Sequence, residues 1–572
     1  MAAAIKHEID LAHPEEMAPA VDAILGANPF VALSPRDTLR ALGQFMANLA
    51  AHPDRFSSRC AELALDLMRI GAGASEIGPE ASDHRFADSA FAENPFYRRL
   101  MQAYLAWRAA MQDLVGLAVE SGGKDWKTPA QERFAVTLLT EALAPTNLLW
   151  GNPAALKRVF DTAGASLLSG MRNFVNDLFT NNGMPTQVDK RPFELGRTIA
   201  ATPGAVVHRG KLCEVIQYRP ATAEVYARPV LLIPPQINKY YVMDMAPKRS
   251  FTEYAVNRGL QFFTVSWRNP GPKDRDLGLD DYVAACEEAA AVAAEITGSP
   301  NVNLAGVCAG GITSSLMLGH LAARRDQRIN AATLIVTMLD SSAPSLTGMF
   351  ANEETVRTAL EASRAKGVLD AATLQRTFAW LRPNDLVWNY WVNNYLMGKR
   401  PAAFDILYWN ADSTNLPARL HAGFLEIMLR NPLVEPDAAK ILDTPIDLRR
   451  FTGDMYVLAG LTDHICAWRA CHRAARLFGD HTEFVVSASG HVQSLVCPPD
   501  NFKMKYFTNS RLGDDPDRWL EGAAEHKGTW WDHWLEWIEQ RSGAKRPAPS
   551  KLGGGRYAPI EAAPGSYVRG RP

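Results

Sequence analysis

The chain has 572 residues, 47% of them hydrophobic, and its 60 Lys and Arg nearly balance its 62 Asp and Glu to give a formal net charge of −2. This length predicts two domains, or one large domain with an extension, and the near-neutral charge argues against general nucleic-acid binding. The seven cysteines show no Cys-x-x-Cys or Cys/His ligand spacing, so the sequence predicts no metal site.

The N-terminal part, residues 1–200, is predicted to be a mainly helical domain. Its first residues lack the apolar core of a signal peptide, and no apolar run in the chain is long enough to cross a bilayer. Because free thiols suit a reducing compartment, we expect a cytoplasmic protein.

One helix of this region has a clear start signal. Asn152 can cap a helix whose first position is Pro153, and the pattern runs toward Phe179. We interpret its apolar stripe as a face packed in a core, although docking on another surface would show the same stripe. The stripe contains Leu156, Val159, Phe160, Ala163, Leu167, Met171, Phe174, Val175 and Leu178.

The pattern changes at a boundary between Gly196 and Pro203. Strand-like segments follow at residues 205–208 and 213–216, and residues 229–233 form another that ends in two prolines. Since proline has no N–H, Gln236 and then Ile237 are the first backbone donors after that strand. Residues 201–572 are predicted to form an α/β catalytic domain.

Residues 306–310 have the form of a nucleophile elbow, with the sulfur of Cys308 where most such elbows carry a serine hydroxyl. A strand over 302–306 and a helix over 312–323 flank it, and the helix N-terminus favours the thiolate. The alternative is a buried structural thiol. In an elbow, the N–H of Ala309 would be the first oxyanion donor, with Gln236 or Ile237 as the second.

Residues 340–446 lie between two predicted strands and are much longer than an ordinary crossover. The segment is rich in aromatic residues. We interpret it as a cap that keeps water away from an acylated site. A helical insertion that serves only packing or dimerisation would show the same aromatic residues.

Two later loops hold candidate partners for Cys308. A strand over 455–460 leads to Asp463, and a strand over 483–486 leads to His491. Loops after the strands of an open α/β sheet meet at one edge, and the order nucleophile, acid, histidine is that of α/β-hydrolases. The sequence therefore predicts a Cys308–Asp463–His491 triad in an α/β-hydrolase fold.

Other residues are weaker candidates for the acid or the base: Asp340 after an earlier strand, His464 beside Asp463, His320 on the helix after the elbow, and His421 in the predicted cap. The tail from Lys545 is rich in proline and glycine and is predicted to lie extended on the surface.

Several motifs together resemble those of single-subunit polyhydroxyalkanoate synthases. The resemblance runs from about residue 200 to the C-terminus and is looser in the N-terminal third, where Ala144-Pro145-Thr146-Asn147 carries it. The motifs are Gly306–Gly311, Pro234–Tyr241, Val265–Pro270, Arg382–Tyr390, Asp463-His464 and Ser489–His491.

The resemblance implies an acyltransferase that polymerises (R)-3-hydroxyacyl-CoA into polyester and releases CoA, with Cys308 as the acylated residue. It implies no cofactor, because the CoA thioester is a substrate. It also implies contact with the growing polyester and the granule surface, a homodimer, and an N-terminal domain that serves one of these associations.

Two alternatives differ in class. One is a cysteine-type α/β-hydrolase that cleaves esters or lactones, and the other is a non-catalytic granule-surface protein. Monomer length stays open: Gln236 and Gln493 resemble the medium-chain synthases, whereas residues 543–546 resemble the short-chain enzymes. No sequence signature identifies the residues that contact CoA.

Overall fold

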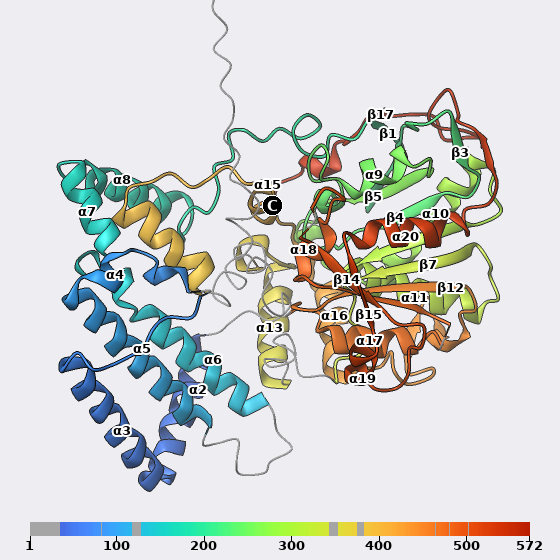
Figure 1. Ribbon diagram of the computed structural model, residues 1–572. Coiled ribbons are helices and arrows are strands. Elements are labelled where there is room, and N and C mark those ends of the chain that lie inside the picture. Colours follow the sequence, from blue (N-terminus) through green and yellow to red (C-terminus); the bar gives the residue numbers. More distant parts are fainter. Residues whose placement is uncertain are drawn as a thin grey trace, which may run out of the picture. The chain divides into compact units, whose positions relative to one another are not determined.

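The computed structural model describes residues 35–81, 83–116, 127–342, 353–374, 383–463, 465–479, 481–501 and 503–571 (Figure 1). They form two compact units. The helical unit holds the described residues up to 189 together with those of 376–402, and the catalytic unit holds the described residues of 190–375 and 403–572. Residues 383–402, which lie within the predicted cap, thus belong to the helical unit.

The helical unit is built on four longer helices. Helix α3 packs on α5, and α6 packs on both α2 and α5. Phe45, Leu114 and Val136 are buried together in one core cluster. The elements are α2 (Pro35–Ala51), α3 (Pro53–Gly71), η1 (His84–Phe86), α4 (Ala90–Glu93), α5 (Pro95–Gly116), α6 (Lys127–Ala142), η3 (Pro145–Asn147), η4 (Leu149–Gly151), α7 (Pro153–Asp161), α8 (Ala165–Thr180), η7 (Asn384–Trp388) and η8 (Trp391–Leu396).

The helix predicted from Asn152 to Phe179 is two helices. Asn152 caps α7 by accepting a hydrogen bond from the N–H of Ala155. The chain then breaks where Ala163 and Gly164 both take positive φ, at 47° and 86°, because a left-handed residue ends an α-helix. The start was predicted correctly, and the continuity was wrong.

The prediction that the apolar stripe packs in a core was also wrong. Phe160 is 75% exposed and Met171 is 62% exposed. Helix α8 instead packs its small and polar face on η8. Gly170 lies so close to the Tyr395 carbonyl that a Cβ would overlap it, and the buried Asp177 accepts a hydrogen bond from the Tyr395 hydroxyl at 2.8 Å.

The catalytic unit is organised around an 11-stranded sheet in the order β15-β14-β13-β12-β7-β6-β4-β5-β2-β1-β17. Six central strands, from β13 to β5, pair in parallel, and the outer strands pair antiparallel. The strands of this sheet are β1 (Gly204–Arg209), β2 (Cys213–Tyr218), β4 (Val230–Ile233), β5 (Phe262–Trp267), β6 (Val302–Val307), β7 (Ile329–Ile335), β12 (Asp454–Gly460), β13 (Glu483–Ser487), β14 (Lys505–Thr508), β15 (Ala524–Lys527) and β17 (Glu561–Ala562).

Burial explains the composition of the central strands. Strands β4, β5 and β6 are buried at every residue, and strands covered on both faces are rich in Val, Ile and Leu because neither face meets water. This large, mainly parallel sheet carries helices between its strands, as the predicted α/β-hydrolase fold requires. The carboxyl ends of β4, β6, β12 and β13 share one edge of the sheet.

Helices cover this sheet, and Figure 1 shows several of them around its strands. Helices α10 and α11 pack on each other. The ring of Phe251 on α9 stacks on that of Trp530 on α20, with 5.5 Å between the ring centroids. The helices are η5 (Tyr240–Met243), α9 (Phe251–Asn257), η6 (Pro272–Asp274), α10 (Leu279–Thr297), α11 (Ala309–Ala323), α17 (Trp468–Arg476), α18 (His491–Leu495), α19 (Pro516–Glu521), α20 (Trp530–Glu539) and η10 (Tyr567–Arg569).

Much of the predicted cap belongs to the catalytic unit, where α13 packs on α16. Residues 343–352 and 375–382 of the cap lie outside the described residues. The cap elements of this unit are α13 (Glu353–Lys366), β8 (Val368–Leu369), α15 (Asp405–Asn410), β9 (Leu416–Pro417), α16 (Ala418–Arg430), β10 (Ala439–Ile441) and β11 (Thr444–Ile446). The short helix η9 (Leu448–Arg450) follows the cap.

The tail from Lys545 is extended, as predicted, and part of it is paired. Strand β16 (Lys545–Pro547) pairs with β3 (Glu224–Tyr226), and β17 adds to the edge of the large sheet beside β1. Within the described residues, no helix is both long and apolar enough to cross a bilayer.

Candidate active site

Cys308 lies on the sharp turn between β6 and α11. Its backbone has φ 51° and ψ −120°, a conformation that L-residues rarely adopt. Two glycines make the turn possible. A Cβ on Gly306 would lie 2.5 Å from the Ser314 hydroxyl, and a Cβ on Gly310 would overlap the carbonyls of Ile233 and Pro234. Close packing of strand, turn and helix therefore holds the sulfur at the end of β6.

Asp463 and His491 meet although 28 positions separate them in the chain. The His491 Nδ1 lies 2.7 Å from one carboxylate oxygen of Asp463, and both side chains are buried. The other oxygen of Asp463 accepts the N–H groups of Ile465 at 2.8 Å and of Cys466 at 2.9 Å. The carboxylate thus has fixed partners on both oxygens, and it leaves Nε2 of His491 available to a different group.

The two loops that carry Asp463 and His491 are joined to each other. The N–H of Leu461 donates to the Ser487 carbonyl at 2.8 Å, and the hydroxyls of Ser487 and Ser489 lie 2.7 Å apart. The Ser489 hydroxyl also lies 3.0 Å from that of Ser494 on α18, the helix that His491 begins. The aspartate and the imidazole are therefore positioned as one unit.

Electrostatics make Cys308 a thiolate. A hydrogen bond from the Cys466 thiol and the nearby His491 imidazolium, with the Ala309 N–H, outweigh burial and lower the pKa of Cys308 to about 5. Burial opposes charge on His491, but Asp463 and the Cys308 thiolate raise the pKa of His491 to about 10. The site is thus a thiolate–imidazolium pair at neutral pH, with the carboxylate behind the imidazole.

The loop after β4 is held next to the elbow, as the oxyanion prediction requires. The Gln236 side-chain amide donates to the Thr313 hydroxyl at 2.9 Å, and Thr414 donates its N–H to the Ile237 carbonyl at 2.8 Å. In the described part of the chain, neither the Gln236 nor the Ile237 N–H donates to a backbone carbonyl. Both remain candidates for the second oxyanion donor beside Ala309.

An apolar pocket opens beside Cys308. Cys308, Ala309 and Ile237 form one part of its lining, and the cap helix α16 contributes Ile427 and Met428. The remaining lining residues are Ile312, Met338, Leu339, Ser341, Ile465 and Cys466. A pocket of this composition suits an alkyl chain better than a polar group.

The weaker sequence candidates have other partners. Asp340 accepts from the Asn431 side chain at 2.8 Å and pairs with Arg473 at 3.3 Å. The ring of His320 lies near Arg324 and Glu287, and that of His421 lies 3.0 Å from the Ser363 hydroxyl. The His464 alternative lies outside the described residues.

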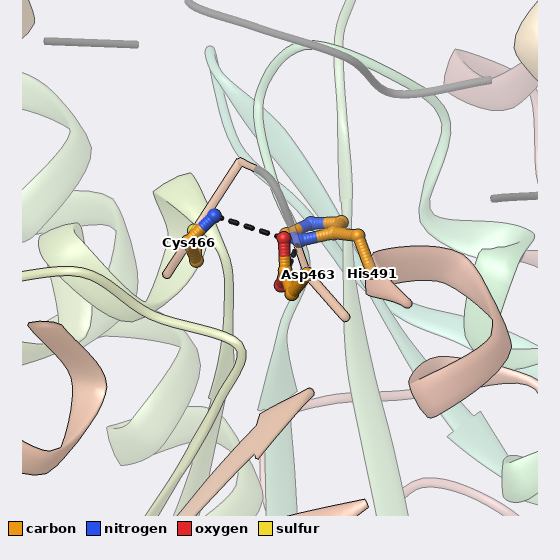
Figure 2. Close-up of side chains that lie close together, drawn as sticks. All are labelled: Asp463, Cys466 and His491. Atoms are coloured by element: carbon orange, nitrogen blue, oxygen red, sulfur yellow. Dashed lines mark hydrogen bonds and ion pairs between the residues drawn. The ribbon is translucent and has the colours of Figure 1, made fainter. Parts of the chain in front are cut away.

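The residue that sequence reasoning missed is Cys466. Figure 2 shows its N–H bonded to Asp463, which in turn contacts His491. Its thiol is buried, lines the same pocket as Cys308 and helps to lower the pKa of Cys308. The available signal was its position three residues after Asp463. An aspartate often accepts hydrogen bonds from the backbone N–H groups two and three residues later, and such a turn places the side chains of those residues near the carboxylate.

Family models match in two places. A model described as "Poly-beta-hydroxybutyrate polymerase (PhaC) N-terminus" matches residues 82–255, and one described as "alpha/beta hydrolase fold" matches residues 229–497. The first therefore covers most of the helical unit, and the second covers Cys308, Asp463 and His491.

Curated relatives match most of the chain. The chain is 44% identical over 547 residues to "Poly(3-hydroxyalkanoate) polymerase 1" of Ectopseudomonas oleovorans. This match covers 96% of the chain and 97% of the relative. The chain is 45% identical to polymerase 2 of the same organism, with 95% and 96% covered. It is 38% identical to "Poly(3-hydroxyalkanoate) polymerase subunit PhaC" of Cupriavidus necator, with 87% and 85% covered.

Proposed function

The chain belongs to the poly(3-hydroxyalkanoate) polymerase family and is thus an acyltransferase that makes polyester from hydroxyacyl-CoA; from this premise we propose that it works through a thioester on Cys308. The observation that carries the proposal is the contact between Cys308, on its strained elbow, and the buried Asp463–His491 pair. This arrangement is the triad of an α/β-hydrolase with a sulfur nucleophile.

In the first step, the Cys308 thiolate attacks the thioester carbonyl of (R)-3-hydroxyacyl-CoA. The Ala309 N–H, with that of Gln236 or Ile237, stabilises the oxyanion. CoA leaves as a thiol after taking the proton of the His491 imidazolium, so His491 ends the step neutral. One thioester replaces another, and the acyl group stays activated on the enzyme.

In the second step, the hydroxyl of another hydroxyacyl unit attacks the acyl group on Cys308. Neutral His491 accepts the hydroxyl proton through Nε2, while Asp463 holds Nδ1 and stabilises the imidazolium that forms. An ester bond forms, the sulfur leaves as a thiolate, and the starting thiolate–imidazolium pair returns.

Polymerisation, rather than hydrolysis, requires that water stays away from the acylated sulfur. The pocket lined by Ile427, Met428, Leu339 and Met338 is apolar, and α16 of the cap forms part of its wall. Water in such a pocket has few hydrogen-bond partners, so an alkyl chain displaces it readily. This supports polymer synthesis over the simple hydrolase, and the intact triad supports catalysis over a passive granule protein.

Asp463→Asn separates the two steps. We expect this variant to acylate Cys308 at a rate close to that of the wild type, because the thiol is already acidic. Elongation should fall by a factor on the order of 100 or more, because the alcohol is weakly acidic and depends on a correctly oriented His491. Stopped-flow detection of CoA should therefore show a normal burst of one equivalent followed by very slow release.

The matched control is Asp340→Asn, since Asp340 is also a buried acid that follows a strand but bonds to Asn431 and Arg473. This variant should release CoA as the wild type does, both in the burst and during elongation. Loss of the burst in a folded Asp463→Asn would mean that Asp463 serves the first attack, and the proposed division of roles would then be wrong.

An exposed apolar face on α7 and α8 supports contact with polyester. Phe160, Leu168, Met171 and Phe179 are 62% to 81% exposed, far more than core residues of a helix. The proposal is that this face binds the granule that the enzyme builds, because the polymer surface is the apolar surface that accumulates beside it. A homodimer and a cytoplasmic location stay predictions.

Replacing these four residues by serine should weaken binding to polyester particles at least tenfold, since each large apolar side chain contributes roughly 1.5–3 kcal/mol when fully buried. Co-sedimentation with washed polyester particles measures this binding. Leu442→Ser on the catalytic unit is the control, because that leucine is also exposed. Equal sedimentation of the fourfold variant and the wild type would show that this face does not bind polyester.

A further inference from the structure

An asparagine joins the end of the cap helix α16 to the edge of the large sheet. Asn431 directly follows this helix. Its side-chain oxygen accepts the N–H of Ser341 at 3.0 Å, and its side-chain nitrogen donates to a carboxylate oxygen of Asp340 at 2.8 Å. Both hydrogen bonds therefore connect α16 to the loop that follows β7.

The backbone of Asn431 does not by itself require an asparagine. The residue has φ 51° and ψ 42°, the left-handed conformation that commonly ends a helix and that glycine adopts most easily. Asparagine tolerates this conformation and, unlike glycine, carries an amide. The two side-chain hydrogen bonds are therefore what asparagine adds at this position.

Asp340 is a fixed partner for this amide. It is 8% exposed, and the oxygen that contacts Asn431 also accepts the N–H of Ser342 at 2.9 Å. The other oxygen lies 3.3 Å from Nε of Arg473 on α17. Burial opposes charge on Asp340, but these hydrogen bonds and the Arg473 charge lower its pKa. A carboxylate with partners on both oxygens keeps its position, so it can hold the end of α16 in place.

The contact borders the pocket beside Cys308. Ser341, which Asn431 binds, lines this pocket together with Ile427 and Met428 from the last turn of α16. The cavity has a volume of about 50 Å³, which is space for roughly three to five water molecules at about 10–15 Å³ each. Movement of the helix end away from the loop would enlarge this small space and admit more water beside an acyl group.

We propose that Asn431 is a positioning residue that keeps α16 closed over Cys308 and so directs the acyl group to chain growth instead of hydrolysis. When the wall opens, water attacks the acyl carbonyl and His491 accepts one proton of that water. A C–O bond forms, the C–S bond breaks, and the free hydroxy acid leaves as the Cys308 thiolate returns. This inference rests on the proposed thioester at Cys308.

Asn431→Gly tests the amide alone, because glycine keeps the left-handed backbone. The full chain is mixed with the (R)-3-hydroxyacyl-CoA that the wild type polymerises, and CoA, free hydroxy acid and polymer are each measured. The CoA burst should match that of the wild type, since acylation precedes the competition between water and hydroxyl. The ratio of free acid to polymer should rise at least about tenfold, the change in an equilibrium constant that corresponds to loss of one hydrogen bond to a charged group.

An exchange of the two residues distinguishes a direct contact from a general loss of stability. Asn431→Asp places a second carboxylate against Asp340 and should also raise the ratio. Asp340→Asn keeps an acceptor oxygen and should not raise it. In the variant that carries both substitutions, the amide at position 340 can donate to the carboxylate at position 431, so the ratio should return toward that of the wild type.

Two results would overturn the proposal. One is a wild-type ratio of free acid to polymer in a folded Asn431→Gly. The other is an exchange variant that makes as much free acid as Asn431→Asp alone. If a thermal melt shows that Asn431→Gly does not fold, the comparison of Asn431→Asp with the exchange variant decides the matter.

Asn182→Gly is the matched control, because Asn182 also has a positive φ, 50°, but lies in the helical unit. It should give the wild-type ratio. Adding Cys308→Ala to Asn431→Gly should leave no free acid above that of a blank without enzyme. Free acid formed without Cys308 would refute the proposed thioester, whereas free acid that depends on Cys308 but does not increase in Asn431→Gly would refute only the role of Asn431.

Discussion

Cys308→Ala should lower polymer synthesis by a factor on the order of 10⁴ or more, the scale for loss of a nucleophile that acts together with its base. The substitution removes the atom that carries the acyl group, so both CoA release and chain growth should stop. Cys308→Ser should fail similarly, because a hydroxyl is far less acidic and the site is arranged for a thiolate. CoA release and polymer mass are the measurements.

The control is Cys286→Ala, another buried thiol, which lies on α10 away from the pocket lining. It makes the same side-chain change, and the elbow keeps its sulfur. Turnover in Cys308→Ala at a rate near that of the control would show that the chemistry does not pass through this sulfur.

His491→Ala should slow acylation by a factor on the order of 100 or more, the usual contribution of a general acid–base residue. It should also raise the pKa of Cys308 from about 5, because the imidazolium helps to lower it. A thiol alkylates as the thiolate, which exists above its pKa. Wild-type alkylation by iodoacetamide should therefore persist down to about pH 5, whereas the variant should lose it at a higher pH.

His320→Ala tests specificity, since this histidine is equally buried and lies on the helix after the elbow. It should leave the acylation rate and the alkylation profile unchanged. An unchanged profile in His491→Ala, together with loss of acylation in His464→Ala, would mean that the other histidine is the base.

The local parts of the site could be predicted from the sequence because each has a local cause. The elbow needs glycine at positions 306 and 310, because a Cβ there would collide with neighbouring atoms. The Gly-x-Cys-x-Gly motif can therefore be recognised in the sequence itself. Asp463 and His491 follow buried strands, and parallel strands bring their carboxyl ends to one edge. The fold and the family follow from these same segments.

Features that depend on packing between distant segments could not be predicted. The apolar stripe of α8 suggested a core face, but Gly170 and Asp177 face η8 instead, and nothing in the periodicity marks η8 as their partner. The break between α7 and α8 occurs at Ala163, a residue that rarely takes positive φ. Cys466 and Cys308 line one pocket although 158 positions separate them in the chain, so no spacing motif could reveal that they are neighbours.

The central claim is that the acyl group is held on Cys308, and peptide mapping of the acylated enzyme tests it most directly. The wild-type enzyme is mixed with one equivalent of hydroxyacyl-CoA, quenched in acid within the first turnover, digested, and analysed by mass spectrometry. We predict that the added acyl mass lies on the peptide that contains Cys308 and is released by hydroxylamine. An acyl group on Cys466, or CoA release without any acylated peptide, would contradict the account.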